Sequence, residues 1–594
     1  TIYCFAGKTS KKIVEISLKP KSSAYRKNQL YIRAAKEIIK RTGKTKGYCL
    51  DISCGQGRLA YELAKRTDLN IYALESDPEK VQTARKLLDE AGLYGTRVTV
   101  LQRDLAATKL PNCFANLIVS SASVKEGADG LSEQEINRIL RPYGGSACLG
   151  KPGEMQLTVR GGIEDAGNWT HQYADPANTN CSPDELIRGP LGVLWFTDND
   201  FEMPSRHGRG PAPLCLDGRL FVEGLHGLRA IDAYNGHVIW EYPLENILKA
   251  YDQEHLMGTA GIGSNFCVTP EGLYIRKDGK CLQLDPATGK LIAEFTAPKL
   301  PQGKQSTWGY IAYKNDTLFG TLADTEHIVQ YRYGRSDMSK QFTQSVLLFA
   351  MDTKTGKLKW SYTPQHSIRN NSIAIGNGNV YFIDAPLDLR DRPDYQNKQQ
   401  RIQNSDSISK KERTLVALNM NDGEIVWTSS KDIYGTMLAL SQKHEILLMA
   451  YQDTRFKLVS EVGGRMSAFR ASNGKRLWDI EARYGSRPIL NDSTIYAQPG
   501  AWDLLTGLKK DFNFVRSYGC GIIAGARNLL AFRSATIGYR DLLSGTGTEN
   551  YGGIRPGCWI NTIPAGGLLL VPDATARCVC SYLIKANIAL QPMQ

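Results

Sequence analysis

A repeated pattern dominates the C-terminal part of this 594-residue chain. In each copy an apolar stretch leads to Asp, Asn or a substitute, a glycine follows four residues later, and a second stretch often ends in Trp. The clear copies lie at 229–242, 282–295, 348–362, 415–429 and 466–480, with weaker ones at 501–512, 539–551 and 559–590. Polar turn residues followed by glycine supply the positive φ of a tight turn, so each copy predicts a β-hairpin.

A second pair of strands precedes each turn, as residues 213–224 and 268–279 illustrate. Four strands per unit, in about eight units, predict a β-propeller of four-stranded antiparallel blades over residues 163–594. Tryptophan recurs at one place in the unit, where a large ring is expected to pack between neighbouring sheets. The recurring residues are Trp240, Trp360, Trp427 and Trp478.

These units resemble the PQQ-like (quinoprotein-type) repeat family, which includes alcohol dehydrogenases and the outer-membrane assembly propeller. Residues 2–18 also resemble the last two strands of such a blade, so we expect a partial blade at 1–18. That expectation implies a longer native chain, with the middle region inserted into a propeller protein. Residues 325–345 and 387–413 interrupt the repeats and are expected to be solvated loops, a lid or partner surface being the alternative.

Residues 19–162 alternate strand and helix signals instead. A strand, a glycine-containing turn and a helix cover 47–66, a strand and a helix follow at 70–92, and further strands are expected at 97–104, 115–121 and 145–150. This alternation predicts a Rossmann-like, doubly wound α/β sheet. The predicted fold class is therefore a multidomain combination of an α/β domain with a β-propeller.

Two acidic residues accompany the glycine-rich turn, which allows backbone to approach a ligand closely. Glu75 ends the second strand, where it can bind a ribose diol, and Asp104 follows the third, where it can meet an adenine amino group. This constellation resembles class I S-adenosylmethionine (SAM)-dependent methyltransferases. The resemblance implies a SAM site formed by Asp51, Ser53, Gly55, Gly57, Glu75, Asp104, Leu105 and Ser120, with no catalytic residue assigned.

Within that site, the resemblance puts Asp51 near the methionine amino group, Asp104 and Leu105 on the adenine, and Ser120 at the transfer site. Ser53 departs from the family pattern because glycine is usual there. The last hairpin of the sheet has only 155–162 available, and no NPPY-like motif follows Ser120. Methyl transfer depends mostly on positioning, so the methyl acceptor stays open, as does a degenerate domain kept for packing or partner binding.

A redox role for the propeller is disfavoured. Quinoprotein dehydrogenases carry an adjacent Cys–Cys pair, a docking Trp and calcium ligands, whereas the nearest pair here, Cys578 and Cys580, is separated by Val579. PQQ and calcium are therefore not expected, and no metal site is assigned. His171 and His207 lie in turn-rich segments, where hydrogen-bonded loop residues and a site at the propeller mouth are the two interpretations.

The charge is unevenly distributed. Residues 1–46 hold 13 Lys or Arg and two acidic residues, which accounts for +11 of the net +13. A solvated basic helix is one interpretation, and an acidic partner or membrane surface is the other; nucleic acid is not favoured. The absence of any apolar run of about 18 residues predicts no transmembrane helix.

Three functions remain open. The first is SAM-dependent methylation, with the propeller presenting a substrate or partner. The second is a non-enzymatic scaffold or interaction protein of the bacterial cell envelope, and the third is a PQQ-dependent oxidoreductase. The two resemblances imply different compartments for the protein, because SAM is a cytoplasmic metabolite whereas the propeller family is mostly exported. The periplasm or cell envelope is favoured, because the propeller resemblance covers more of the chain. The 13 cysteines are expected to be mainly buried thiols, with one or two disulfides.

Overall fold

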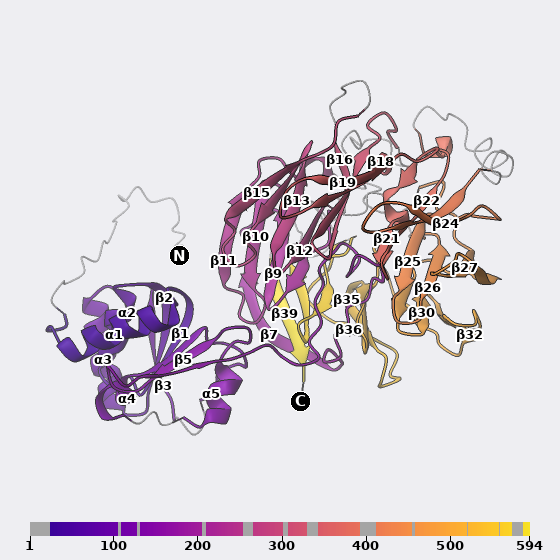
Figure 1. Ribbon diagram of the computed structural model, residues 1–594. Helices are drawn as coiled ribbons and strands as arrows, with labels where there is room; N and C mark the ends of the chain where they lie inside the picture. Colours follow the sequence, from indigo (N-terminus) through magenta and orange to yellow (C-terminus); the bar gives the residue numbers. More distant parts are fainter. Residues whose placement is uncertain are drawn as a thin grey trace, which may run out of the picture. The chain divides into compact units, whose positions relative to one another are not determined.

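The computed structural model describes residues 24–104, 108–127, 131–204, 210–252, 265–300, 307–329, 342–392, 412–453, 458–519, 521–557, 559–572 and 586–593. Its contacts divide the chain into two compact units, Thr1–Gly161 and Gly162–Gln594. Figure 1 shows an α/β unit at the N-terminal end and a large β unit after it. The predicted partial blade at 1–18 lies outside the described residues.

The N-terminal unit is a six-stranded sheet with helices against it. Its helices are α1 (Gln29–Thr42), α2 (Arg58–Ala64), α3 (Pro78–Glu90), α4 (Ser121–Glu126) and α5 (Glu133–Ile139), and its strands are β1 (Lys46–Ile52), β2 (Asp68–Glu75), β3 (Val98–Gln102), β4 (Leu117–Ser120), β5 (Ser146–Leu149) and β6 (Gln156–Val159). The strand order is β3-β2-β1-β4-β5-β6. All neighbours run parallel except β6, which pairs antiparallel with β5. This is the predicted α/β sheet, ended by a single antiparallel strand.

Local signals account for the helix boundaries. The side chain of Asn28 accepts a hydrogen bond from Leu30 N–H at the start of α1, and Gly43 ends that helix with φ +66°. At α3, Asp77 caps the first turn and Pro78 occupies the first helical position. The sheet is covered by apolar residues on both faces, with Leu59, Leu63 and Leu88 in one core and Ile136 and Ile139 in the other.

The second unit consists of antiparallel sheets in succession along the chain. The first two are β8 (Leu214–Leu216), β9 (Arg219–Gly224), β10 (Gly227–Asp232) and β11 (Val238–Pro243), then β12 (Phe266–Thr269), β13 (Gly272–Lys277), β14 (Lys280–Leu284) and β15 (Leu291–Thr296). A nine-stranded sheet follows with β16 (Trp308–Lys314), β17 (Thr317–Ala323), β18 (Gln344–Asp352), β19 (Leu358–Tyr362), β20 (Ile368–Arg369), β21 (Ala374–Gly376), β22 (Asn379–Asp384), β23 (Thr414–Asn419) and β24 (Ile425–Ser429).

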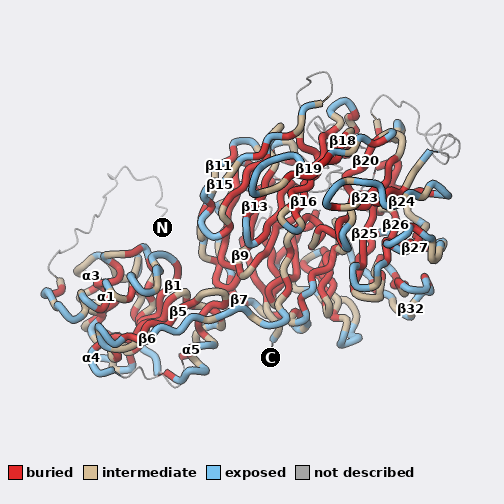
Figure 2. Tube along the Cα trace, viewed as in Figure 1, coloured by how far each residue is buried: buried red, intermediate tan, exposed pale blue. Residues whose placement is uncertain are grey.

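Four more four-stranded sheets complete the unit. They are β25 (Met437–Ser441), β26 (Ile446–Ala450), β27 (Arg465–Arg470) and β28 (Arg476–Glu481); β29 (Ile489–Asn491), β30 (Thr494–Ala497), β31 (Gly500–Asp503) and β32 (Lys509–Lys510); β33 (Ala524–Gly525), β34 (Leu529–Ser534), β35 (Thr536–Asp541) and β36 (Thr548–Tyr551); and β37 (Ile563–Ala565), β38 (Leu568–Pro572), β39 (Ala586–Pro592) and β7 (Leu191–Asp198). Short 3-10 helices are η2 (Lys249–Tyr251), η5 (Asn370–Ser372) and η6 (Leu389–Asp391). Figure 2 shows buried strands and exposed connecting loops.

The repeated Trp and Gly belong to one contact between successive sheets. The indole N–H of Trp240 donates to the carbonyl of Pro286 at 3.0 Å, inside the next repeat's turn. A Cβ added at Gly289 in that turn would lie 2.6 Å from the Trp240 ring. The same relation joins Gly474 to Trp427 across two sheets, and Gly423 to Trp360 across two successive repeats within the nine-stranded sheet. The turn glycine is therefore required for its positive φ and for the ring beneath it, which confirms that the tryptophans pack between sheets.

We predict that Gly474→Ala lowers the free energy of unfolding more than Gly378→Ala does. Both glycines have positive φ, +69° and +78°, so each alanine costs about 1 kcal/mol of backbone strain. Only at Gly474 does the new Cβ meet a neighbour, the Trp427 ring at 2.5 Å, which adds ~1–3 kcal/mol of overpacking. Urea unfolding followed by tryptophan fluorescence measures both, and equal losses would contradict the proposed contact.

One segment links the sheets of the second unit to each other. We call residues 167–182 the inner segment. Backbone N–H groups of successive sheets donate to its carbonyls: Gly566, just after β37, to Gly167 (2.7 Å), Cys215 to Trp169 (2.7 Å), Val268 to Thr170 (3.0 Å), Ile375 to Pro176 (2.8 Å), Leu440 to Ala177 (2.8 Å), Leu490 to Thr179 (2.9 Å) and Gly525 to Asn180 (3.0 Å). Shortly after it, β7 pairs with β39 near the other end of the unit.

His171 belongs to this inner segment and serves it structurally. Its Nε2 accepts the backbone N–H of Tyr313 at 3.2 Å, and its Nδ1 lies 2.8 Å from the hydroxyl of Thr170. Burial lowers the pKa of His171 to about 3, so the ring is neutral and can accept that hydrogen bond. Of the two interpretations, the structure supports the hydrogen-bonded loop residue. His207, Cys578 and Cys580 lie outside the described residues.

The described cysteines of both units are buried thiols. They are Cys49, Cys54, Cys113, Cys148, Cys181, Cys215, Cys267 and Cys281. This agrees with the predicted buried thiols for the described part of the chain. The remaining cysteines lie outside the described residues, so the expected disulfides stay a prediction.

Candidate functional site

The glycine-rich loop joins the end of β1 to the start of α2. Three of its residues have left-handed backbone: Ser53 at φ +49°, Gly55 at φ +57° and Gly57 at φ +77°. Gly57 caps α2, and a Cβ there would lie 3.1 Å from the hydroxyl of Tyr25. At Gly55 an added Cβ would meet nothing within 4 Å. The loop therefore turns sharply and leaves open space beside Gly55.

Glu75 holds this loop in place from the end of the neighbouring strand β2. One carboxylate oxygen accepts the backbone N–H of Gly55 at 2.8 Å, and the other accepts those of Ser76 at 3.0 Å and Asp77 at 3.2 Å. The side chain is buried. A carboxylate offers about four acceptor positions, so one remains, on the oxygen that faces Gly55.

Asp51 lies fully buried one residue before the end of β1. Its two oxygens accept the backbone N–H and the hydroxyl of Ser121, both at 2.9 Å. Burial raises the pKa of Asp51 to about 7, the charge of Glu75 adds to the rise, and the hydrogen bonds from Ser121 oppose it. The proton affinity of this carboxyl is therefore poised near neutral pH, next to the loop.

Ser120 has a structural role at the end of β4. Its hydroxyl accepts the backbone N–H of Ser123 at 3.0 Å and so caps α4, while its carbonyl accepts the hydroxyl of Ser123 at 3.0 Å. The side chain is completely buried. The structure thus places Ser120 beside Ser121 and Asp51, but its hydroxyl is committed to the helix. No helix was expected at α4 from the sequence.

The two residues expected at the adenine, Asp104 and Leu105, are not part of the glycine-rich loop. Asp104 follows β3 and is exposed, at the same sheet edge as Glu75. Leu105 lies outside the described residues. The structure therefore brings together Asp51, Ser53, Gly55, Gly57 and Glu75, while Ser120 is buried on the neighbouring strand β4.

Two tyrosines near this loop were not singled out from the sequence. The hydroxyl of Tyr25 donates to the carbonyl of Gln56 at 2.7 Å, and its ring lies 4.5 Å from that of Tyr61. Tyr31, in the first turns of α1, is half-buried, and burial followed by the charge of Asp51 raises its pKa. The available signal was a pair of aromatic residues at the start of a basic helix, which also suits ordinary packing.

Replacing Ser53 with glycine should stabilise the N-terminal unit. A non-glycine residue in left-handed backbone costs about 1 kcal/mol, and Ser53 stands at φ +49°. We expect S53G to raise the free energy of unfolding by about that amount, whereas S76G, at an exposed position without positive φ, should not. The described α-helices all lie in this unit, so the helical circular dichroism signal reports its unfolding. A loss of stability in S53G would count against strain at Ser53.

Comparisons with known proteins assign each unit separately. A family model described as a methyltransferase domain matches residues 49–144. A model described as outer membrane protein assembly factor BamB matches residues 277–497. Two curated relatives, dehydrogenase subunits of quinone alcohol dehydrogenases from Gluconacetobacter polyoxogenes and Komagataeibacter europaeus, are each 23% identical over 203 residues, covering 33% of this chain. The match spans a quarter (25%) of each relative's length.

Solved structures show the same division. One described as a candidate SAM-dependent methyltransferase from Methanococcus maripaludis is 31% identical, covers 23% of this chain and 58% of that chain, and has a TM-score of 0.19. A quinohemoprotein alcohol dehydrogenase from Pseudomonas putida is 15% identical, covers 72% of this chain and 62% of that chain, and has a TM-score of 0.35. On the two family matches and the sheets described above, the chain joins a methyltransferase domain to a PQQ-like β-propeller repeat domain.

Proposed function

We propose that the N-terminal unit binds SAM and transfers its methyl group to a substrate that the propeller presents. The observation that carries the proposal is the contact between Glu75 and Gly55. It brings a strand-end carboxylate and a glycine-rich loop together within the region matched by the methyltransferase model. The buried acid of Asp51 lies at the same loop.

The residues present fit such a ligand. The acceptor position left on Glu75 suits a ribose hydroxyl, and the open space at Gly55 lets backbone approach the ligand. Asp51 keeps acceptor positions beyond those used by Ser121, which suits the methionine amino group. Asp104 and Leu105 are proposed to contact the adenine. When bound, SAM supplies an activated methyl group on a sulfonium, and the protein's task is to orient the acceptor.

Isothermal titration calorimetry of the full chain with SAM and with S-adenosylhomocysteine tests the binding step. Saturable binding of both, competing for one site, is the expected result. Absence of heat with either ligand, confirmed by equilibrium dialysis with radiolabelled SAM, would overturn the proposal. Transfer itself is tested separately, by release of S-adenosylhomocysteine in the presence of a bacterial extract.

A second candidate function is a scaffold in which the methyltransferase domain no longer reacts. Ser53 in left-handed backbone and the commitment of Ser120 to the cap of α4 favour this alternative. Such a domain would bind a partner without turnover, so SAM binding without any transfer would support it. For the quinoprotein alternative, the test is a quinone absorption band after addition of PQQ and calcium.

For the propeller we propose eight blades, with a substrate or protein partner bound at one face. The proposal divides the nine-stranded sheet at β20, where Ile368 pairs with Ser345 on β18 and with Asp384 on β22. The successive contacts of the inner segment support that division. An experimental structure of the full chain would count the blades directly.

The compartment remains a prediction, and we propose the cell envelope. Among helices of the described residues, none has the length and apolar character that a membrane span needs. Counting reactive thiols in protein taken from its native compartment tests the proposal, since oxidised cysteines indicate export. The basic stretch of residues 1–46 is proposed to meet an acidic partner, and loss of salt-dependent association after its neutralisation tests that.

A further inference from the structure

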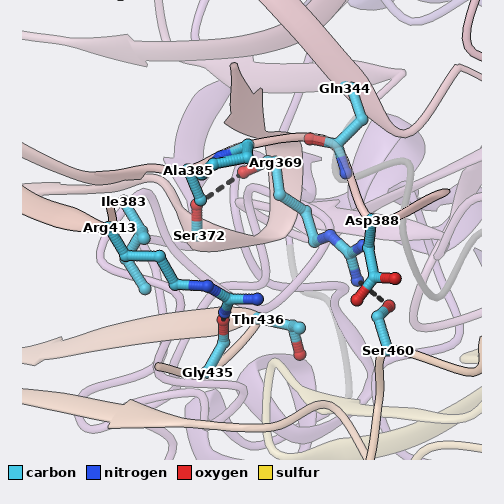
Figure 3. Close-up of a pocket in the computed structure, with 11 residues that line it drawn as sticks. Gln344, Arg369, Ser372, Ile383, Ala385, Asp388, Arg413, Gly435, Thr436 and Ser460 are labelled. Carbon is cyan, nitrogen blue, oxygen red and sulfur yellow. Dashed lines mark hydrogen bonds between the residues drawn. The ribbon is translucent and has the colours of Figure 1, made fainter. Parts of the chain in front are cut away.

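A narrow pocket lies within the second unit. It encloses about 20 Å³ between the end of β22 and the starts of β23 and β25. Its polar lining includes Gln344, Arg369, Asp388, Arg413, Thr436 and Ser460. In Figure 3, the side chains of Arg369, at the end of β20, and Arg413, just before β23, both reach toward the pocket.

Two guanidinium groups are paired with carboxylates, that of Arg369 in the lining and that of Arg390 beside the lining residue Asp388. Arg369 donates to Asp391 and Glu461, both at 3.0 Å, and to the hydroxyl of Ser460 at 2.8 Å. Arg390 donates to both oxygens of Asp388, its Nε contact being 2.8 Å. These bonds direct the lining carboxylate of Asp388 toward Arg390, so neither cation needs a further anion.

Arg413 differs from both. Its one hydrogen bond to a described residue is a long contact of 3.5 Å from Nη1 to the carbonyl of Gly435. Its Nε is buried without an acceptor among the described residues. Arg413 is partly buried, and a guanidinium N–H that is withdrawn from water without an acceptor is costly unless an anion compensates it. Burial also lowers the pKa of Arg413.

We propose that this pocket binds a carboxylate group, held by Arg413. A guanidinium presents parallel N–H donors that match the two oxygens of a carboxylate. The space, about 20 Å³, suits a carboxylate head, since a single water needs about 10–15 Å³. A bulkier, more highly charged phosphate is disfavoured by that size and by Asp388 on the wall. The carboxylate comes either from a small acid or from the C-terminus of a peptide.

Fluorine NMR of trifluoroacetate with the full chain tests the proposal. We expect protein-dependent line broadening that excess propionate abolishes. R413Q should reduce this broadening at least tenfold, and so should A385L, which fills the pocket but retains Arg413. R483Q, at an exposed arginine after β28, is the matched control and should behave as wild type. If R413Q fails to fold, A385L still tests the proposal.

Competition distinguishes the two sources of the carboxylate. Acetyl-trialanine, which ends in a free carboxylate, and its C-terminal amide are compared with propionate. If the acid displaces trifluoroacetate at concentrations about tenfold below those of propionate and the amide does not displace it, the natural ligand is a peptide C-terminus. Displacement by both acids at similar concentrations identifies a small acid. The proposal is overturned if wild-type protein causes no broadening that propionate can abolish, or if R413Q and A385L broaden the signal as much as R483Q.

Discussion

Replacing Arg369 with leucine is expected to lower the free energy of unfolding of the propeller unit by about 3–5 kcal/mol. Arg369 pairs with Asp391 and Glu461, and both carboxylates are 0% exposed. Leucine would leave two buried negative charges without a cation, which low-dielectric surroundings penalise strongly. All nine tryptophans follow residue 162, so urea unfolding followed by tryptophan fluorescence reports this unit alone.

A second arginine offers the matched control. Arg229 is also buried and also pairs with two carboxylates, Asp200 and Glu241, but these are 82% and 51% exposed. In R229L both acids remain solvated, so the loss should stay near 1 kcal/mol or below. E461Q should restore part of the stability of R369L, because it removes one uncompensated charge. Equal losses in R369L and R229L would show that carboxylate burial is not the cause.

Changing Glu75 to glutamine should weaken SAM binding about 100-fold, an effect of ~3 kcal/mol. Both carboxylate oxygens accept backbone N–H groups, on one side from Gly55 and on the other from Ser76 and Asp77. A glutamine must therefore turn its NH₂ toward an N–H donor, which leaves buried donors unsatisfied. If the NH₂ group of the glutamine faces Gly55, the loop loses its hydrogen bond and the ribose loses its acceptor. If it faces Ser76 and Asp77, the N–H groups of those two residues lose their acceptor.

Calorimetric titration of E75Q with SAM measures this loss. E79Q, an exposed acid in the first turn of α3, is the control and should bind as wild type does. Helical circular dichroism shows whether E75Q remains folded, which separates a lost contact from a lost domain. Unchanged affinity in E75Q would remove Glu75 from the proposed site, while SAM binding by the wild type would stand.

The repeated sheets could be predicted because their signals are local. Gly289 has positive φ and lies four residues after Asp285. Its N–H donates to the carbonyl of Asp285 at 2.8 Å and closes the turn. Such turns are encoded within a few residues, as are the alternating strands around them. The pairing of β7 with β39 is different in kind, because it joins residues nearly 400 positions apart. No local pattern marks that partner.

The candidate site divides in the same way. Glu75 could be placed at the loop because parallel strands end at one edge of a sheet, and its bond to Gly55 agrees with that expectation. The position of Ser120 in the chain was equally clear, yet its hydroxyl caps α4. A serine at the end of a strand can face a ligand or cap the next helix, and only the path of the following residues decides between them.

The sequence by itself determined the order of an α/β domain and a repeated β domain, together with the residues at the strand ends. These follow from backbone preferences and hydrophobic periodicity, which act over neighbouring residues. Only the tertiary structure decided which polar groups are compensated. Arg369 and Arg413 both line one pocket, but among the described residues folding brings Asp391 and Glu461 to the first and gives the second only a long contact to a carbonyl. Burial and partners depend on segments remote in the chain, so the chemistry of each charge emerges only when they meet.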